Sequence, residues 1–226
     1  MSHLAVNTTA LKTLPFFSVF SDDELQTLVP HIQHRHVSRH AFMLRAGENT
    51  NALYVILSGK AKIVINNDLG REVTIATLGP AEFFGEMSLI DDKPHSASVQ
   101  ALEPCQVLCI SKPAFSLCVR NHLDAVTVLL RIVVTRLRAA DRKIASLALL
   151  DVNGRVARLL TELAREVNGV CVVDTGSEEI ARMVGASREM VSRVLKDMIE
   201  RGLIKRDKRK IIVLEPRSTN LSGAIK

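Results

Sequence analysis

Five side chains between residues 188 and 196 could read the edges of DNA bases. Arg188, Glu189, Ser192, Arg193 and Lys196 recur at spacings that place them on one face of a helix. Arginine pairs bidentately with a guanine edge, and glutamate accepts a hydrogen bond from the cytosine amino group. The alternative is a solvated helix with a Glu189–Arg193 ion pair, which is worth about 0.3 kcal/mol. These residues alone do not separate the two interpretations.

The neighbouring elements favour DNA reading. The buried stripe of the same helix is predicted at Val191, Val194, Leu195 and Met198. Ser187 can cap this helix after a tight turn that starts at Gly185, and a first helix is predicted over Glu178–Val184, opened by a capping box at 175–178. Two short helices joined by a glycine-containing turn are the helix-turn-helix signature. A β-hairpin with a basic tip follows at 203–214, so we also expect Ser187 and Lys208 at the DNA surface.

Charge and composition agree with a nucleic-acid partner. The chain has 226 residues, 47% of them hydrophobic, which allows one large domain or two modest ones. Its net charge is +6 and its pI about 9.4, and Arg201–Lys210 contains six Lys or Arg residues. No apolar run reaches membrane-spanning length and the N-terminus lacks the build of a signal peptide, so we expect a soluble cytoplasmic protein without a membrane partner.

A long helix is predicted over residues 123–147, with a heptad seam along one side. The seam consists of Leu123, Val126, Leu130, Val133, Leu137, Ala140, Ile144 and Leu147. Its spacing alternates between three and four, and no Pro or Gly interrupts it. A seam of this length needs a partner helix, and the same helix from a second copy is the simplest partner. The alternative is a core helix packed on its own domain.

Short β-rich runs before this helix predict a small antiparallel barrel or sandwich. The runs are Ala41–Arg45, Leu53–Leu57, Ala61–Ile65, Val73–Thr77, Ala97–Ala101 and Val107–Ile110. A capping box at Ser21–Glu24 predicts a short helix that ends near Val29. After the long helix, the turn cluster Asp151–Gly154 is expected to act as a hinge. A helix over Arg155–Val167 and a strand at Cys171–Val173 should follow.

Neither a metal site nor an active site is predicted. The cysteines (Cys105, Cys109, Cys118 and Cys171) form no CxxC pair, and Cys105 and Cys109 are interpreted as buried free thiols. A histidine group (His31, His34, His36 and His40) alternates with arginines, which favours a solvated strand edge over metal ligation. No glycine-rich phosphate loop, nucleophile elbow or paired carboxylates support an enzyme with a regulatory domain, so no catalytic residue is expected.

Three segments resemble the CRP/FNR family of bacterial transcription regulators. Residues 184–195 (VGASREMVSRVL) resemble its helix-turn-helix, 149–157 (LLDVNGRVA) its hinge and 83–89 (FFGEMSL) its cyclic-nucleotide-binding β-roll. The resemblance covers about Leu14 to Leu214. It implies an α+β architecture: a jelly-roll-like β-roll over 1–122 that binds an effector, a dimerisation helix and hinge over 123–150, and a winged helix-turn-helix over 151–226.

The resemblance also implies the DNA partner. Residues that match Arg188, Glu189 and Arg193 contact bases of a TGTGA-like half-site, and Lys196 lies near a phosphate. A homodimer would place two such helices one helical turn, about 34 Å, apart on a palindrome. RNA polymerase is an expected further partner. A non-specific DNA binder stays open as an alternative, and it would show salt dependence without sequence preference.

An effector site is implied at Gly85, Glu86, Met87, Ser88, His95, Ser96, Arg138 and Asp141. Members that bind cyclic AMP hold the ribose with the residue matching Glu86. They hold the phosphate with an Arg-Ser pair, which is His95-Ser96 here, and reach adenine with a Thr-Ser pair, which is Ala140-Asp141 here. A neutral imidazole does not replace the permanently charged fork of a guanidinium on phosphate. These changes disfavour cyclic AMP.

Three possibilities remain for the effector. Cyclic di-GMP is favoured, because arginines on the long helix (Arg131, Arg136, Arg138 and Arg142) could meet its phosphates or stack on its guanines, although each one singly is more often a solvated flank. A cyclic nucleotide held weakly by Glu86, Ser96 and protonated His95 is the second, and a regulator without a ligand is the third. An iron–sulfur sensor is disfavoured because no Cys lies in the first hundred residues, and no spacing supports haem ligation.

Overall fold

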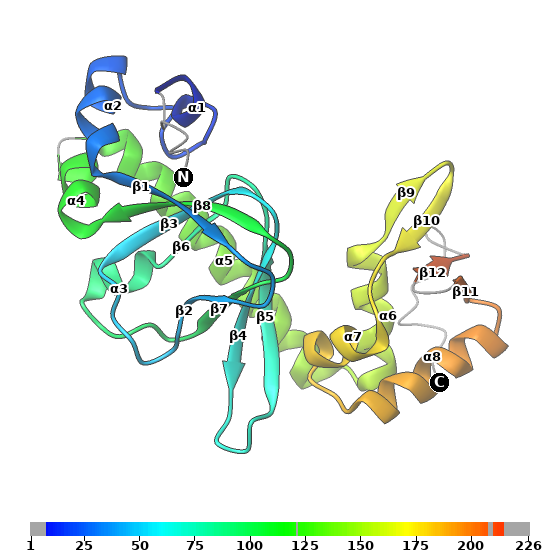
Figure 1. The fold of residues 1–226 in the computed structure, drawn as a ribbon. Helices are drawn as coiled ribbons and strands as arrows, with labels where there is room; N and C mark the ends of the chain where they lie inside the picture. The colour runs from blue at the N-terminus through cyan, green and yellow to red at the C-terminus, as the bar shows by residue number, and fades with distance from the viewer. Residues whose placement is uncertain (1–7, 121, 208–209, 215–226) are drawn as a thin grey trace. The chain divides into compact units, whose positions relative to one another are not determined.

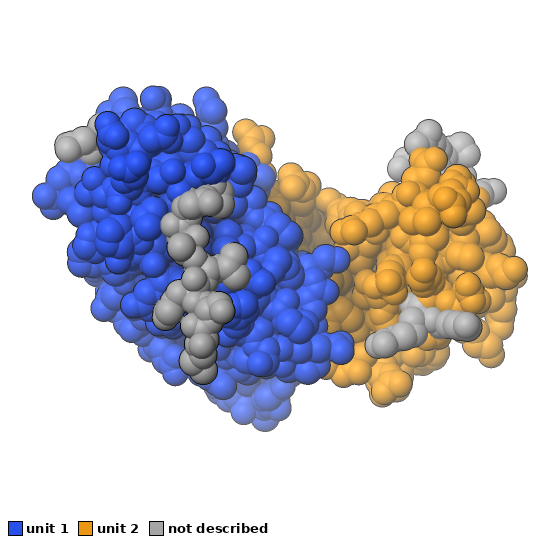
Figure 2. All heavy atoms as spheres, turned by 45° about the horizontal axis from the view of Figure 1, so that its top comes forward, with its two compact units in different colours: residues 1–137 blue, residues 138–226 orange. Residues whose placement is uncertain are grey.

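The computed structural model describes residues 8–120, 122–207 and 210–214, and of Ala10 and Cys118 it describes the backbone alone. The chain divides into two compact units, residues 1–137 and 138–226 (Figure 2). No helix in the described part of the chain is long and apolar enough to cross a membrane.

The first unit is built on two four-stranded antiparallel sheets (Figure 1). One sheet has the order β1 (Ile32–Val37), β8 (Cys105–Ser111), β3 (Ala52–Ser58), β6 (Phe83–Phe84). The other has the order β2 (Phe42–Leu44), β7 (Ser98–Ala101), β4 (Ala61–Asn66), β5 (Glu72–Leu78). An apolar core that includes Tyr54, Phe84 and Val107 draws residues from both sheets. Alternating side chains of β3, β7 and β8 supply much of this core, as expected for a β-roll.

Helices and a short 3₁₀ turn accompany the sheets. They are α1 (Thr8–Lys12), α2 (Asp22–Leu28), η1 (Val29–His31), α3 (Glu86–Asp91), α4 (Lys112–Arg120) and α5 (Leu123–Leu149). A second core, rich in phenylalanine, packs the N-terminal segment against the first sheet and α5. Phe16 contacts Phe17 and Phe20 edge-on in this core. The capping box of α2 is formed, with Ser21 and Glu24 each bonded to the other's backbone amide.

The long helix α5 carries two different apolar faces. Ala125 and Leu129 are buried in the phenylalanine-rich core, with Ile132 packed against it. The predicted seam, by contrast, is exposed: Leu123 is 86%, Leu137 60% and Ile144 64% exposed. The alternative in which the seam packs on its own domain is therefore wrong, because different residues of α5 make that contact.

The second unit is a small α+β domain. Its elements are α6 (Val152–Leu163), β9 (Arg165–Val167), β10 (Val170–Val173), α7 (Ser177–Val184), α8 (Arg188–Glu200), β11 (Ile204–Asp207) and β12 (Lys210–Val213). The strands form an antiparallel sheet in the order β11-β12-β10-β9. The three helices and the sheet share one core, in which Val156, Ile180 and Val191 are fully buried. This arrangement is a winged helix-turn-helix.

All six strands predicted before the long helix are present, with ends that agree to within two residues. The helix predicted over Arg155–Val167 is wrong at both ends. It begins at Val152, because Asp151 caps it by accepting from the Gly154 amide at 2.8 Å, so the expected hinge cluster is the first helical turn. It ends at Leu163, because Arg165–Val167 pairs with β10 across an Asn168-Gly169 turn in which both residues have positive φ.

Two further expectations concern caps and thiols. The capping box predicted before α7 is not formed, since Gly176 is its N-cap and makes no side-chain hydrogen bond there. Cys105 and Cys109 are buried free thiols, as predicted, and burial raises the pKa of both. Cys171 is a half-buried free thiol.

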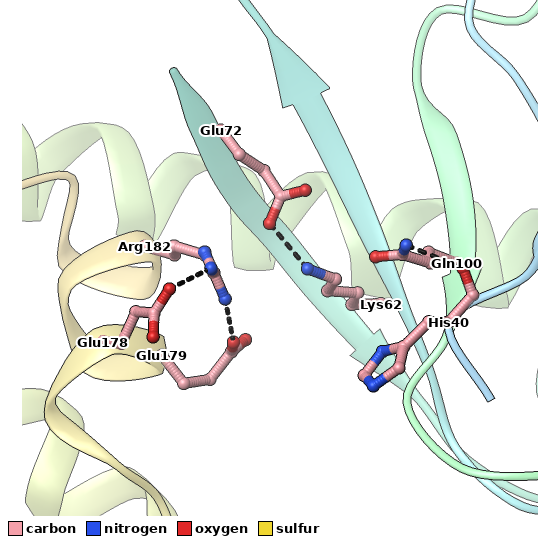
Figure 3. Close-up of polar contacts among 7 residues, drawn as sticks. All are labelled: His40, Lys62, Glu72, Gln100, Glu178, Glu179 and Arg182. Atoms are coloured by element: carbon pink, nitrogen blue, oxygen red, sulfur yellow. Dashed lines mark hydrogen bonds and ion pairs between the residues drawn. The ribbon is translucent and has the colours of Figure 1, made fainter. Parts of the chain in front are cut away.

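Polar pairs stabilise both units locally (Figure 3). On the β4–β5 hairpin, Lys62 Nζ lies 2.6 Å from Glu72 Oε1. Nearby on β7, the Gln100 amide donates to the His40 carbonyl at 2.8 Å. On α7, Arg182 pairs with both Glu178 and Glu179, as i,i+4 and i,i+3 neighbours on a helix do.

Candidate functional site

Two local features fix the start of α8. Gly185 ends α7 in the left-handed conformation, with φ of 66°, which glycine adopts without a Cβ penalty. Ser187 then caps α8 by accepting a hydrogen bond from the Met190 amide at 3.2 Å, as predicted. Together they turn the chain within three residues and orient the N-terminal end of α8.

The predicted reading face of α8 is exposed. Its buried stripe is Val191, Val194, Leu195 and Met198, exactly the four predicted residues, and the exposed set is Ser187, Arg188, Glu189, Ser192, Arg193 and Lys196. The pKa of Glu189 is lowered because its carboxylate accepts from its own backbone amide and from the Ser187 hydroxyl. Glu189 is thus held as an anion at the helix N-terminus, beside two arginines.

The wing, which is the hairpin of β11 and β12, carries basic side chains on its described residues. Lys205, Arg206 and Lys210 are exposed on β11 and β12. Lys208, predicted at the wing tip, lies outside the described residues.

The segment that resembles a nucleotide-binding motif forms a tight turn into α3. Gly85 has φ of 88°, and a Cβ on it would lie 2.7 Å from the Ala52 carbonyl oxygen, so no other residue fits without strain. Glu86 begins α3 and is only 4% exposed, whereas Met87 is 58% exposed. Ser88 is buried and donates to the Gly85 carbonyl at 3.1 Å.

Arg136 on α5 is the partner of Glu86. One guanidinium nitrogen lies 2.6 Å from Glu86 Oε1, and the other donates to the Phe83 carbonyl. The guanidinium also lies 5.1 Å from the centroid of the Phe83 ring. From the sequence, Arg136 was one of four arginines that could meet the phosphates of cyclic di-GMP, each singly more often a solvated flank, and its pairing with Glu86 was not predicted. The signal that could have revealed it is its spacing from Ala125, Leu129 and Ile132, which continues the face of α5 that packs on its own roll.

His95 is buried and hydrogen-bonded away from solvent. It is 7% exposed, and its Nε2 lies 2.9 Å from the Thr50 hydroxyl and 3.4 Å from the Thr50 amide nitrogen. Burial lowers the pKa of His95, while Glu48 and Glu86 act in the opposite direction. A fixed cation therefore does not stand at this position at neutral pH. Ser96 is exposed, with its hydroxyl 4.0 Å from the Met87 sulfur.

Two family models match the chain in the same order as the two units. Residues 34–122 match the cyclic nucleotide-binding domain, and residues 154–218 match the Crp-like helix-turn-helix domain. The cAMP-activated global transcriptional regulator Vfr of Pseudomonas aeruginosa is 35% identical over 189 residues, which span 80% of this chain and 88% of Vfr. The chain belongs to the CRP/FNR family of transcription regulators.

Other relatives within this family differ in what their names say they sense. The cyclic AMP receptor protein of Thermus thermophilus is 32% identical over 86% of this chain and 90% of its own length. The solved structure of CLP from Xanthomonas campestris, described as a c-di-GMP responsive global regulator, superposes with a TM-score of 0.75 at 28% identity. It covers 86% of this chain and all of the CLP chain. These relatives are transcription regulators and not enzymes. This CRP/FNR-family member is likewise a transcription regulator and not an enzyme.

The remaining predicted site residues of this family member are less enclosed. Arg138 and Asp141 are exposed on the part of α5 that belongs to the second unit, and their effector contacts stay predictions. The histidine group lies on and beside β1, an edge strand as predicted, where the His34 and His36 rings are 4.9 Å apart. Among the described residues, no three His, Cys, Asp or Glu side chains converge as metal ligands.

Proposed function

We propose that this regulator acts as a homodimer that reads a palindromic DNA site under the control of a nucleotide second messenger. The observation that carries the DNA part is the exposed, capped N-terminal half of α8, where Arg188, Glu189 and Arg193 stand clear of the core. These three supply guanine-edge and cytosine-edge contacts, and Lys196 supplies a phosphate contact. A regulator of this kind works in the cytoplasm, where the chromosome lies. RNA polymerase is its further partner.

A binding titration tests the DNA contacts. Replacing Arg188 by Ala should weaken binding to a palindrome of two TGTGA-like half-sites by about 1–3 kcal/mol and relax one base position. Fluorescence anisotropy with a set of single-base half-site variants measures both effects. Arg158→Ala is the matched control, because Arg158 lies on α6 of the same unit and pairs with Glu162 on its own helix at 2.9 Å.

The alternatives give different titrations. Unchanged affinity of the Arg188→Ala variant for every half-site would contradict the assignment of this residue. A wild-type protein that binds all sequences equally, with a steep dependence on salt, would instead be a non-specific DNA binder.

The exposed seam of α5 supports the dimer. Leu130 and Leu137 are each about 60% exposed, and Leu147 is 46% exposed, in a row with the spacing of a two-stranded coiled coil. Apolar side chains that are repeated in this way along one helix are covered in the working protein. We propose that residues 123–150 form the dimerisation element between an effector domain (1–122) and a DNA-binding domain (151–226).

The pair between Glu86 and Arg136 supports a nucleotide as the effector. A buried carboxylate can accept from a sugar hydroxyl, and a guanidinium can donate to a phosphate, so the two side chains match the two polar ends of a nucleotide. Cyclic di-GMP is our first candidate, since His95 offers no fixed cation for a single cyclic phosphate. Exposed Arg131 and Arg138 on α5 are available to a ligand with two phosphates and two guanines.

Cyclic AMP is the second candidate, favoured by Glu86 at the position that resembles the family's ribose contact. Calorimetric titration with cyclic AMP, cyclic GMP and cyclic di-GMP should show the tightest binding for cyclic di-GMP, and Glu86→Gln should weaken it. Glu103→Gln, an exposed carboxylate before β8, is the control. Tight binding of cyclic AMP alone would reverse the order of the candidates, and no binding of any nucleotide would leave a ligand-independent regulator.

A further inference from the structure

The segment that carries His95 is tied to the turn after β2. The His95 amide donates to the Glu48 carbonyl at 2.9 Å, and the Gly47 amide donates to the His95 carbonyl at 2.8 Å. Two backbone bonds in opposite directions fix the position of residue 95 against this turn. The main chain of residue 95 is therefore fixed, and the ring itself is held by its contacts with Thr50.

The contacts of the ring define its protonation state. A backbone amide can only donate, so His95 Nε2, which receives the Thr50 amide, must present a lone pair. The ring is then neutral, with its proton on Nδ1. The Thr50 hydroxyl, 2.9 Å from Nε2, is adaptable: it donates to the neutral ring and can accept from a protonated one. The geometry stabilises the neutral ring yet leaves a hydrogen-bond acceptor for the charged ring.

The charges around His95 are unfavourable to an anionic ligand while the ring is neutral. Glu48 on the turn after β2 and Glu86 on α3 both lie within electrostatic range of it. Arg136 on α5 compensates one carboxylate, because it already pairs with Glu86 at 2.6 Å. Because Arg136 is paired with Glu86, the charge that acts on the ring without this compensation is that of Glu48, and it repels a nucleotide phosphate.

We propose that His95 is the specificity-determining residue that couples effector binding to uptake of one proton: the nucleotide phosphate binds when the ring takes a proton from solvent at Nε2 and becomes an imidazolium. This inference rests on the proposed nucleotide effector. It adds that the site accepts this effector when His95 is protonated. The site then discriminates against phosphate-bearing ligands at alkaline pH and accepts them in mild acid. A permanent guanidinium in the same place would make no such distinction.

The direction of the pH effect follows from linkage. Burial lowers the pKa of His95 in the free protein below its ordinary value of 6.5, and a bound phosphate must raise the pKa in the complex. Affinity is strongest below the pKa of the free protein and weakest above that of the complex. Between these two values the dissociation constant should tighten by about tenfold for each unit that the pH falls, the limit for one proton.

Calorimetry over pH 5.5–8 tests this directly, with the full-length protein and with cyclic AMP and cyclic di-GMP as probes. Neither phosphodiester titrates in this range. Repeating each titration in buffers of different ionisation enthalpy gives the number of protons taken up, which we expect to approach one between the two pKa values. This measurement uses the wild-type chain and therefore does not depend on a variant that folds.

Two variants assign the proton. His95→Asn, which cannot take a proton, should bind the probes weakly at every pH and without uptake, and His95→Arg should bind them tightly with no pH dependence. Binding by the wild type without pH dependence or uptake would overturn this inference and leave the nucleotide effector intact. Uptake that persists in His95→Asn would overturn it as well. If neither probe binds at any pH, the nucleotide effector and this inference fail together.

Discussion

At the scale of single residues, Glu86 presents the sharpest energetic constraint. A carboxylate that is 4% exposed loses most of its hydration, and it is tolerated only with a charged or hydrogen-bonding partner. Arg136 supplies that partner from α5, fifty residues away in the sequence, and satisfies the Phe83 carbonyl as well. The pair therefore links the turn into α3 with the long helix.

Removing Arg136 should destabilise the protein more than removing both charges. Arg136→Ala leaves the Glu86 carboxylate buried without its cation, and we expect a loss of about 1–3 kcal/mol in the free energy of unfolding. In the double variant with Glu86→Gln, a neutral amide replaces the carboxylate and part of this loss should be recovered. Urea unfolding of the two single variants and the double variant measures the coupling. Losses that simply add would show that the two side chains do not interact.

Residue-level prediction worked where the interaction partner lies within one turn. Ser21 with Glu24, and Ser187 with the Met190 amide, were predicted because a cap needs only a side chain three residues from an open backbone amide. The capping box predicted at 175–178 was wrong, because Gly176 is the N-cap of α7 and has no side chain that could bond to an open amide. The pairing of Arg136 with Glu86 was not predicted, because several arginines lie off the seam of α5 and only packing decides which one faces the roll.

At the scale of elements, α5 carries two apolar faces, one buried and one exposed. Ala125 and Leu129 are the fully packed residues that attach it to its own unit, and the heptad seam stays exposed beside them. A single apolar stripe would have to serve one purpose or the other. Because the two stripes are offset around the helix, α5 can pack on the roll and still offer the seam to a second copy.

Charges placed in the seam should separate the dimer. Leu130→Glu combined with Leu137→Glu would bring like charges together and remove apolar burial at the centre of the proposed interface. Sedimentation velocity should then report a monomer where the wild type is a dimer. Ala145→Glu adds the same charge at an exposed position outside the seam and should leave the dimer intact. A wild type that sediments as a monomer at micromolar concentration would refute the proposed interface.

At the scale of the whole molecule, α5 belongs to both compact units. It contributes Arg136 to the first unit and runs on as one helix to Leu149, beyond the boundary at residue 137. A ligand that draws Arg136 away from Glu86 acts on α5. This helix ends at Leu149, and after Leu150 the chain reaches Asp151, the N-cap of α6. We propose that control of DNA reading passes along this helix, as a shift between two packings.

Thermodynamic linkage makes this control measurable from both ends. If the effector tightens DNA binding tenfold, which is about 1.4 kcal/mol, saturating DNA must tighten effector binding by the same factor. Effector titrations with and without the palindromic DNA, paired with DNA titrations with and without effector, give the two factors. An effector that binds while both factors equal one would show that it does not control DNA reading.

Through the resemblance of three motifs, the sequence by itself determined the family and the order of the domains. Through periodicity, caps and turns it determined six of the eight strands of the roll and the exposed face of α8. Periodicity, caps and turns act over a few residues, and they can therefore be predicted without the tertiary structure. Only the tertiary structure decided what surrounds the effector site. Arg136 meets Glu86 across 50 residues and His95 meets Thr50 across 45, so neither contact has a local signature. The lowered pKa of His95 follows from burial, which exists only once the roll has packed around the ring.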